Sequence, residues 1–220
     1  MERQIHMNEV SDGKLYGLND MVKADCQDCV GCSACCKGMG NSIVLDPYDV
    51  YRLTCGLHVS FEQLLQGYVE LNVVDGIILP NLAMAGDQEQ CAFLNEEGRC
   101  SIHSIRPGIC RLFPLGRIYE NNYFQYFLQV HECTKENKTK VKVKKWIDTP
   151  DVKRYEEFIN SWHYLQKDLQ AKCREMGDEA FSKQVSMTVL QVFYLTPYDT
   201  QRDFYEHFQE RYENLQERGF

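Results

Sequence analysis

Five cysteines fall within eleven residues of this chain. The block runs from Cys26 to Cys36 with the spacing C-x2-C-x2-C-x2-C-C. Thiolates are soft, strongly donating ligands, and three or four of them at two-residue spacing can turn toward one ion or cluster. A loop so dense in cysteine leaves little room for regular structure. The block therefore predicts a metal site around which this part of the chain is organised.

A disulfide framework is the competing interpretation of such a block. It needs an oxidising compartment, but the N-terminal residues show no apolar stretch flanked by basic residues, as a secretory signal would. Eleven is an odd number of cysteines, and the neighbours Cys35 and Cys36 are a strained place for a disulfide. We therefore expect reduced or metal-bound thiols in a cytoplasmic protein.

Composition places the chain among globular proteins that bury a core, because 44% of its 220 residues are hydrophobic and 25% are charged. The net charge of −8 argues against nucleic acid as a partner, and no apolar run approaches the roughly 20 residues that span a bilayer. The lysine-rich stretch 138–145 is interpreted as an exposed edge strand rather than a polyanion site. A protein partner is left open.

Capping and turn signals predict elements outside the block. Asp46-Pro47 and Ser60 with Gln63 are helix-start signals, so two short helices are expected from these positions. Two hairpins are expected at residues 75–76 and 121–122, where Asp-Gly and Asn-Asn pairs separate apolar runs.

The C-terminal part of the chain has helical periodicity. Three amphipathic helices are expected, beginning at Thr149-Pro150, near Asp178 and at Thr196-Pro197. Their aromatic stripes are expected to form a core rather than a ligand pocket. The predicted fold is α+β, with a leader (1–25), a loop-rich cysteine metal-binding domain with short hairpins (26–134) and a C-terminal three-helix segment (135–220).

A second group of candidate ligands follows in the middle of the chain. Cys91, Cys100, His103 and Cys110 have the spacing C-x8-C-x2-H-x6-C, and Cys133 comes later. A turn at 95–98 would fold the first two thiols toward each other. His103 and His131, each near a motif cysteine, are interpreted as groups that support the ligands more often than they bind the metal. Cys55 and Cys173 lie in expected helices and are interpreted as buried thiols.

The segments CVGCSACC (29–36) and CAFLNEEGRCSIHSIRPGICRLFPLG (91–116) resemble the YkgJ-type cysteine-cluster family. That family is described as a zinc- or iron-chelating domain, and a similar domain occurs in flagellin lysine N-methylases. The resemblance spans about residues 26 to 133 and does not reach the C-terminal helices. Cys26 is an additional cysteine, and Ser33 stands where glycine is common in the family. The resemblance places the family's cysteines on Cys29, Cys32, Cys35, Cys36, Cys91, Cys100, Cys110 and Cys133.

The Arg-Pro and Cys-Arg-x-Phe-Pro elements of the family fall on Arg106-Pro107 and on residues 110–114. Arg106 and Arg111 are the predicted cofactor-binding residues, because a guanidinium offsets the negative charge of a thiolate assembly. The alternative is a role in turns and salt bridges, with Pro107 holding Arg106 in an extended conformation. Both interpretations stay open.

The leading functional hypothesis is an iron-sulfur centre of the [4Fe-4S] type, with zinc as the alternative. The sequence leaves open whether the thiols form one centre or two. Two other hypotheses are a metal-dependent modification enzyme similar to the lysine methylases and a metal storage or delivery module. The predicted metal ligands are Cys26, Cys29, Cys32, Cys35, Cys36, Cys91, Cys100, Cys110 and Cys133.

Overall fold

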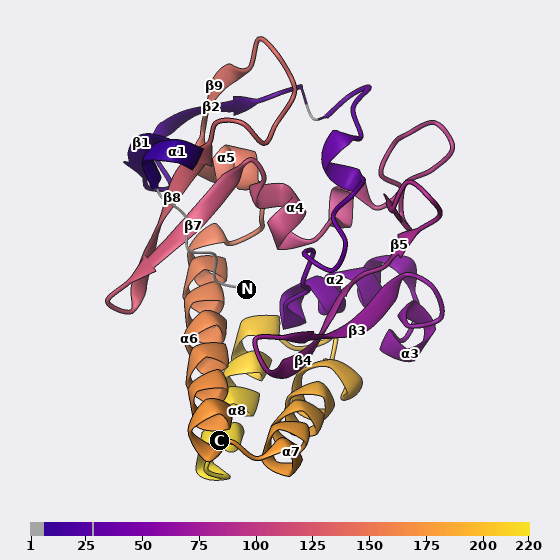
Figure 1. Cartoon of the computed structure of the whole chain (residues 1–220), viewed down its shortest axis with the longest axis vertical. Helices are drawn as coiled ribbons and strands as arrows, with labels where there is room; N and C mark the ends of the chain where they lie inside the picture. The colour runs from indigo at the N-terminus through magenta and orange to yellow at the C-terminus, as the bar shows by residue number, and fades with distance from the viewer. Residues whose placement is uncertain (1–6, 28) are drawn as a thin grey trace. The chain divides into compact units, whose positions relative to one another are not determined.

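A computed structural model describes residues 7–27 and 29–220 and divides the chain into two compact units, each described by itself. Unit 1 comprises Met1–Ile43 and Met84–Val152, and unit 2 comprises Val44–Ala83 and Lys153–Phe220 (Figure 1). Unit 1 contains α1 (Met7–Val10), β1 (Ser11–Tyr16), β2 (Met21–Asp25), η1 (Ala34–Cys36), β5 (Met84–Ala85), β6 (Gln90–Cys91), η2 (His103–Ile105), α4 (Gly108–Leu112), β7 (Leu115–Glu120), β8 (Tyr123–Gln129), β9 (Thr139–Lys142) and α5 (Val143–Ile147). Unit 2 contains α2 (Pro47–Leu57), α3 (Phe61–Leu64), β3 (Val69–Val74), β4 (Ile77–Leu82), α6 (Val152–Met176), α7 (Glu179–Leu190), the π-helical η3 (Gln191–Leu195) and α8 (Phe204–Glu217).

Unit 1 is built on an antiparallel sheet of strand order β1-β8-β7. Its β7–β8 hairpin turns at Asn121 and Asn122, both with positive φ, as the Asn-Asn pair predicted. The strand β8 leads directly into the segment that carries Cys133. The hairpin therefore fixes where this distant cysteine enters the metal-binding part of the chain.

A second antiparallel pair in unit 1 joins β2 to β9 (Figure 1). The β2 side chains Val22 and Ala24 are fully buried. The lysine-rich stretch is confirmed as a strand only in part, because β9 ends at Lys142 and α5 begins at Val143. Val143 is buried and starts a helix whose buried face holds it against the unit, so the strand does not continue.

Unit 2 contains the second predicted hairpin, β3–β4, which turns at Asp75-Gly76 with positive φ at both positions. The predicted caps of α2 and α3 are confirmed as capping boxes at Asp46 and Ser60, although α3 ends already at Leu64. The Ile78 amide donates to Ser186 Oγ at 3.1 Å, which joins β4 to α7.

The three long helices of unit 2 confirm the predicted amphipathic pattern, and their aromatic side chains form its core. Phe158 and Phe208 are buried with ring centroids 4.7 Å apart, and Trp162 and Phe193 are 5.1 Å apart. Edge-on contacts of this kind add to the burial of apolar area. The interpretation of the stripes as core is therefore confirmed.

Two predicted helix starts were wrong. The helix α6 begins at Val152, because Asp151 adopts a left-handed conformation and Thr149 Oγ1 donates to the Ile147 carbonyl instead of capping a helix. The helix α8 begins at Phe204, capped by Asp203, whereas Thr196 ends the π-helical turn before it. Pro197 lies in the irregular segment between the two helices, and Asp203 supplies the cap of α8.

The α+β fold class is confirmed, but the described part of the predicted leader is folded. Residues 7–25 form α1, β1 and β2, and residues 1–6 lie outside the described residues. The two compact units also cut across the predicted boundaries at 25/26 and 134/135, because residues 44–83 pack with the C-terminal helices. No helix in the described ranges combines the length and hydropathy needed to cross a membrane.

Candidate metal centre

The β2–β9 pair brings the start of the cysteine block and the Cys133 segment together. Cys26 follows directly after β2, and Asp25 Oδ2 accepts a hydrogen bond from Thr139 Oγ1 at 3.2 Å. Lys135 Nζ donates to the Val30 carbonyl at 2.8 Å, although 105 residues separate the two. These contacts explain how a cysteine far along the chain reaches the first block.

The cysteine block itself is a succession of tight turns. Cys29 and Gly31 have φ values of 58° and 64°, in the left-handed region. The Cys32 amide donates to the Cys29 carbonyl at 3.0 Å, and the Cys36 amide donates to the Ser33 carbonyl at 2.9 Å. The first of these turns carries the chain from Cys29 back to Cys32, and both residues line the same cavity, whereas the second ends at Cys36, which does not.

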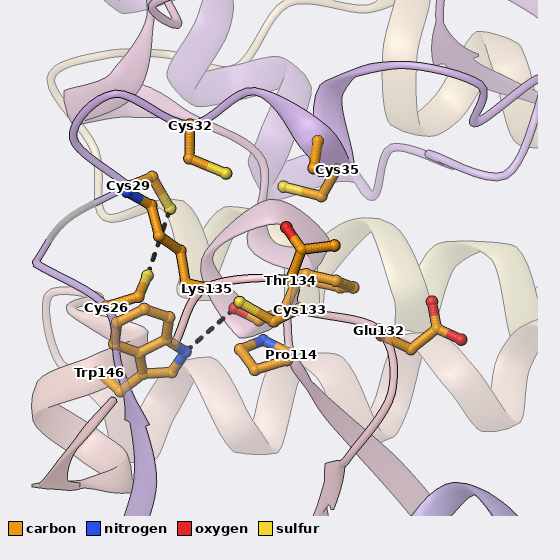
Figure 2. Close-up of a pocket in the computed structure, with 12 residues that line it drawn as sticks. Cys26, Cys29, Cys32, Cys35, Pro114, Glu132, Cys133, Thr134, Lys135 and Trp146 are labelled. Atoms are coloured by element: carbon orange, nitrogen blue, oxygen red, sulfur yellow. Dashed lines mark hydrogen bonds between the residues drawn. The ribbon is translucent and has the colours of Figure 1, made fainter. Parts of the chain in front are cut away.

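Five cysteines line one small cavity of about 20 Å³ in unit 1 (Figure 2). The Sγ atoms of Cys26 and Cys29 face each other at 3.7 Å, and Figure 2 shows the sulfur atoms of Cys32 and Cys35 turned toward one another. The sequence grouped four of these residues by their spacing and added Cys133 through the family resemblance. The cysteines that the structure brings to this cavity are Cys26, Cys29, Cys32, Cys35 and Cys133.

Apolar side chains form one part of the remaining cavity wall, and Glu132, Thr134 and Lys135 form another. Phe113, Pro114 and Trp146 line it, and Trp146 Nε1 donates to the carbonyls of Leu112 and Phe113 at 3.3 and 3.2 Å. Trp146 is 8% exposed and lies on α5. Sequence reasoning missed Trp146 and Lys135, and no motif signalled either residue. An apolar wall excludes water from thiolates and strengthens the electrostatic interactions among them.

Cys91 and Cys100 form a second group of thiols, folded together by a turn. The Leu94 amide donates to the Cys91 carbonyl at 2.8 Å, and Leu94 forms a β-bridge with Cys100. The Gly98 amide donates to the Asn95 carbonyl at 2.9 Å, which confirms the predicted turn at 95–98.

The charge of the Cys35 thiolate raises the pKa of thiols in both groups. Burial raises the pKa of Cys29 to about 12, and Cys35 adds to the rise. The pKa of Cys35 itself is raised, most strongly by a hydrogen bond with the Cys36 thiol. Burial also raises the pKa of Cys91 and Cys100, and Cys35 adds to both. These thiols are therefore protonated at neutral pH without a metal, and metal binding has to release protons.

Arg106 lies where its charge acts on both groups of thiols. Burial raises the pKa of Cys29 and Cys100, and the Arg106 guanidinium opposes the rise at each. The same guanidinium contacts the ring nitrogens of His103. A second, polar cavity of about 480 Å³ borders this position and is lined by Cys100, Ser101, His103, Ser104, Arg106, Arg111 and Asp148.

Arg111 is 3% exposed and holds the backbone around α4 together. Its Nε donates to the Arg106 carbonyl at 3.1 Å, one Nη donates to the Asp148 carbonyl at 2.7 Å, and the other donates to the Ser104 carbonyl. These contacts match the alternative considered for Arg111, a role in turns, and the same side chain also borders the polar cavity.

Arg111→Met should therefore destabilise the chain, whereas Arg106→Met should act mainly on the metal. Arg111 donates three hydrogen bonds to backbone carbonyls, and a hydrogen bond to a charged group contributes about 1.5–3 kcal/mol, so the loss for Arg111→Met should be several times that of an ordinary surface change. Chemical denaturation of both variants measures the difference in unfolding free energy. If the Arg111 variant were as stable as the wild type, Arg111 would not have this structural role.

The remaining candidate residues are placed as follows. Cys36 lies in η1 and Cys110 in α4, and neither is among the residues that line the two cavities described. His131 is exposed, Cys173 is buried as predicted, and Cys55 is half-buried. None of the eleven cysteines, all of which the structure describes, forms a disulfide. Within residues 7–27 and 29–220, no three His, Cys, Asp or Glu side chains lie close enough to hold one ion, so binding requires the sulfurs to draw together.

A family model named CxxCxxCC, described as a "putative zinc- or iron-chelating domain", matches residues 28–138. The match covers half of the chain and supports metal binding as its function. It includes eight of the nine predicted metal ligands, all except Cys26. No solved structure matches the chain. The matched segment contains the cavity cysteines from Cys29 on and the Cys91–Cys100 turn, and the chain belongs to the CxxCxxCC family.

Proposed function

We propose that the chain carries a [4Fe-4S] cluster bound by Cys29, Cys32, Cys35 and Cys133. The observation that carries this proposal is the convergence of a C-x2-C-x2-C run and one remote cysteine on a single cavity. This ligand pattern is the one that bacterial ferredoxin loops use for a cubane cluster. The three thiols of the run would bind three irons, and the distant cysteine would bind the fourth.

The surroundings of the cavity support a redox-capable or electron-rich centre. Phe113, Pro114 and Trp146 limit the access of water, and solvent exposure is one of the factors that set a cluster's potential. Arg106 supplies a positive charge that acts on Cys29 and Cys35, two of the four proposed ligands, and would offset the negative charge of their thiolates. Both features would stabilise a buried anionic centre.

A zinc ion is the second candidate, and one distance favours it. The sulfur atoms of Cys26 and Cys29 are 3.7 Å apart. Two thiolates bound at about 2.3 Å to one tetrahedral ion lie about 3.8 Å apart. In this alternative Cys26 and Cys29 share an ion with Cys32 and Cys133, and Cys26 becomes essential although it lies outside the matched family segment.

Cys26→Ser separates the two candidates. If the cluster is correct, anaerobically purified Cys26→Ser protein retains its iron, sulfide and visible absorption, because Cys26 is not among the four ligands. If zinc occupies the cavity, the wild type contains no iron and Cys26→Ser loses one zinc per chain. Elemental analysis with a parallel absorption spectrum measures both. Wild-type protein that contains no iron after anaerobic preparation would contradict the proposed iron-sulfur cluster.

A further inference from the structure

We propose that a lysine-rich surface of unit 1 docks an acidic segment of a partner protein beside the metal cavity. The surface lies on β2, β9 and α5 (Figure 1). The inference goes beyond the proposed function and does not depend on which metal occupies the cavity. The residues of this lysine surface are Lys23, Lys140, Lys142, Lys144 and Lys145.

The charge of the lysine surface differs from that of the rest of the chain. Residues 137–147 contain five lysines and no aspartate or glutamate, whereas the whole chain has 24 lysines and arginines against 32 aspartates and glutamates. All five members of the surface are exposed. Within residues 7–27 and 29–220, none of them forms an ion pair with a carboxylate. Neighbouring like charges repel, so a partner that brings carboxylates would relieve the repulsion.

The β2–β9 pair presents its lysines on one face. Lys23 is exposed between Val22 and Ala24, which are fully buried. Side chains alternate between the two faces of a strand, so Lys140 and Lys142 share one face of β9. Val141, which separates them, lies opposite the buried Val22. The three lysines therefore lie on the outward face of the pair.

The helix α5 extends this surface without a break in the chain. Lys144 and Lys145 are exposed, whereas Trp146 and Ile147 are buried. The Lys144 amide donates to the Leu18 carbonyl at 2.9 Å, which holds the start of α5 against the segment that leads into β2. Two segments more than a hundred residues apart thus contribute to one basic surface.

Protection of a sheet edge explains only part of this cluster. In the described part of the chain β9 pairs with β2 alone, and lysines on such an edge strand discourage pairing with other chains. Lys23 lies on the other strand, however, and Lys144 and Lys145 lie on a helix, where this explanation does not apply. Residues 140–145 also lie beyond the segment that the family model matches, so the family match does not account for them.

The lysine surface borders the cavity of the proposed metal centre. Cys26 follows directly after β2 and lines the cavity, and Trp146 follows Lys145 on α5 and lines it as well. Lys138 Nζ, just before β9, donates to the Cys133 carbonyl at 3.0 Å. A partner seated on the lysine surface would therefore lie beside the cavity wall.

An acidic protein segment fits this surface better than a nucleic acid. Met21 is 48% exposed and lies directly opposite Lys142, so an apolar side chain is available among the lysines. Protein interfaces combine such apolar contacts with complementary charges. Single-stranded nucleic acids stack on exposed aromatic side chains, but the only aromatic residue of β2, β9 and α5 is the buried Trp146.

Charge reversal on β9 tests the inference with a synthetic peptide in which glutamates flank a central pair of leucines. Fluorescence anisotropy measures its binding to the full-length, metal-loaded protein at about 0.1 M ionic strength, where charges more than about 10 Å apart are largely screened. The double variant Lys140→Glu and Lys142→Glu should lower the affinity about tenfold or more. Lys153→Glu with Lys183→Glu makes the same change of charge at exposed positions of unit 2 and should change the affinity less than about twofold.

Three further probes separate the possible occupants of the surface. A peptide with glutamine in place of glutamate should bind about tenfold more weakly or less, and Met21→Ser should weaken binding of the leucine-containing peptide. A single-stranded oligonucleotide and phosphatidylserine vesicles should bind more weakly than the acidic peptide. Equal or tighter binding of either would overturn the protein partner. Wild-type protein that does not bind the acidic peptide, or an equal loss of affinity in the unit 2 control, would overturn the docking surface itself.

Discussion

Cys133→Ser should abolish the iron-sulfur centre although it changes none of the cysteines of the block at residues 26–36. Among the cysteines of the cavity, Cys133 alone comes from outside residues 26–36. Serine keeps the size of the side chain, but its hydroxyl is a hard, far less acidic group and a poor substitute for a thiolate. We expect iron per chain and visible absorption to fall close to zero, with a large drop in the melting temperature of unit 1.

Metal analysis, absorption and thermal unfolding of the anaerobically prepared variant measure this result. Cys173→Ser is the matched control, because it makes the same exchange in a buried cysteine of unit 2 and should leave the metal content unchanged. Wild-type iron content in Cys133→Ser would show that the remote cysteine is not a ligand. The cluster would then have to be held by the cysteine block alone.

Local signals in the sequence were sufficient where a few neighbouring residues decide the structure. Asp75-Gly76 and Asn121-Asn122 adopt the positive φ values that a two-residue hairpin requires, and Asp46 caps α2. The Thr196-Pro197 signal failed because the same residue types also end helices and form turns. Asp203 caps α8 instead. The start of this helix depends on where the chain returns to the aromatic core of unit 2, which is tertiary information.

The candidate site shows the same division between local and tertiary information. Spacing singled out Cys26, Cys29, Cys32 and Cys35, which line the cavity together, whereas Cys133 was predicted from the family resemblance. Trp146 and Lys135 could not be found in this way. They reach the cavity through the α4–α5 contact and the hydrogen bond from Lys135 to Val30, which join segments far apart in the sequence.

Removal of the metal should unfold unit 1 and leave unit 2 folded. The cysteine loops of unit 1 are short and rich in turns and have no apolar core of their own. We therefore expect the bound metal to hold them together. Apparent binding free energies of structural zinc reach about 10–16 kcal/mol in small domains, and much of this energy is folding energy. Unit 2 has its own core around Phe158, Trp162 and Phe208. Because closure entropy grows slowly with loop length, unit 2 tolerates an unfolded segment 84–152 within its chain.

The two tryptophans of the chain report on the two units separately, since Trp146 lies in unit 1 and Trp162 in unit 2. Trp162→Phe leaves Trp146 as the only indole, and its emission should shift toward that of exposed tryptophan when a chelator removes the metal. Trp146→Phe leaves Trp162, whose emission should stay that of a buried indole. A store that releases metal to a modest chelator would leave both signals unchanged, because cargo does not hold the fold together. Simultaneous exposure of both indoles would instead mean that the units fold as one cooperative structure, and that the metal stabilises the whole chain.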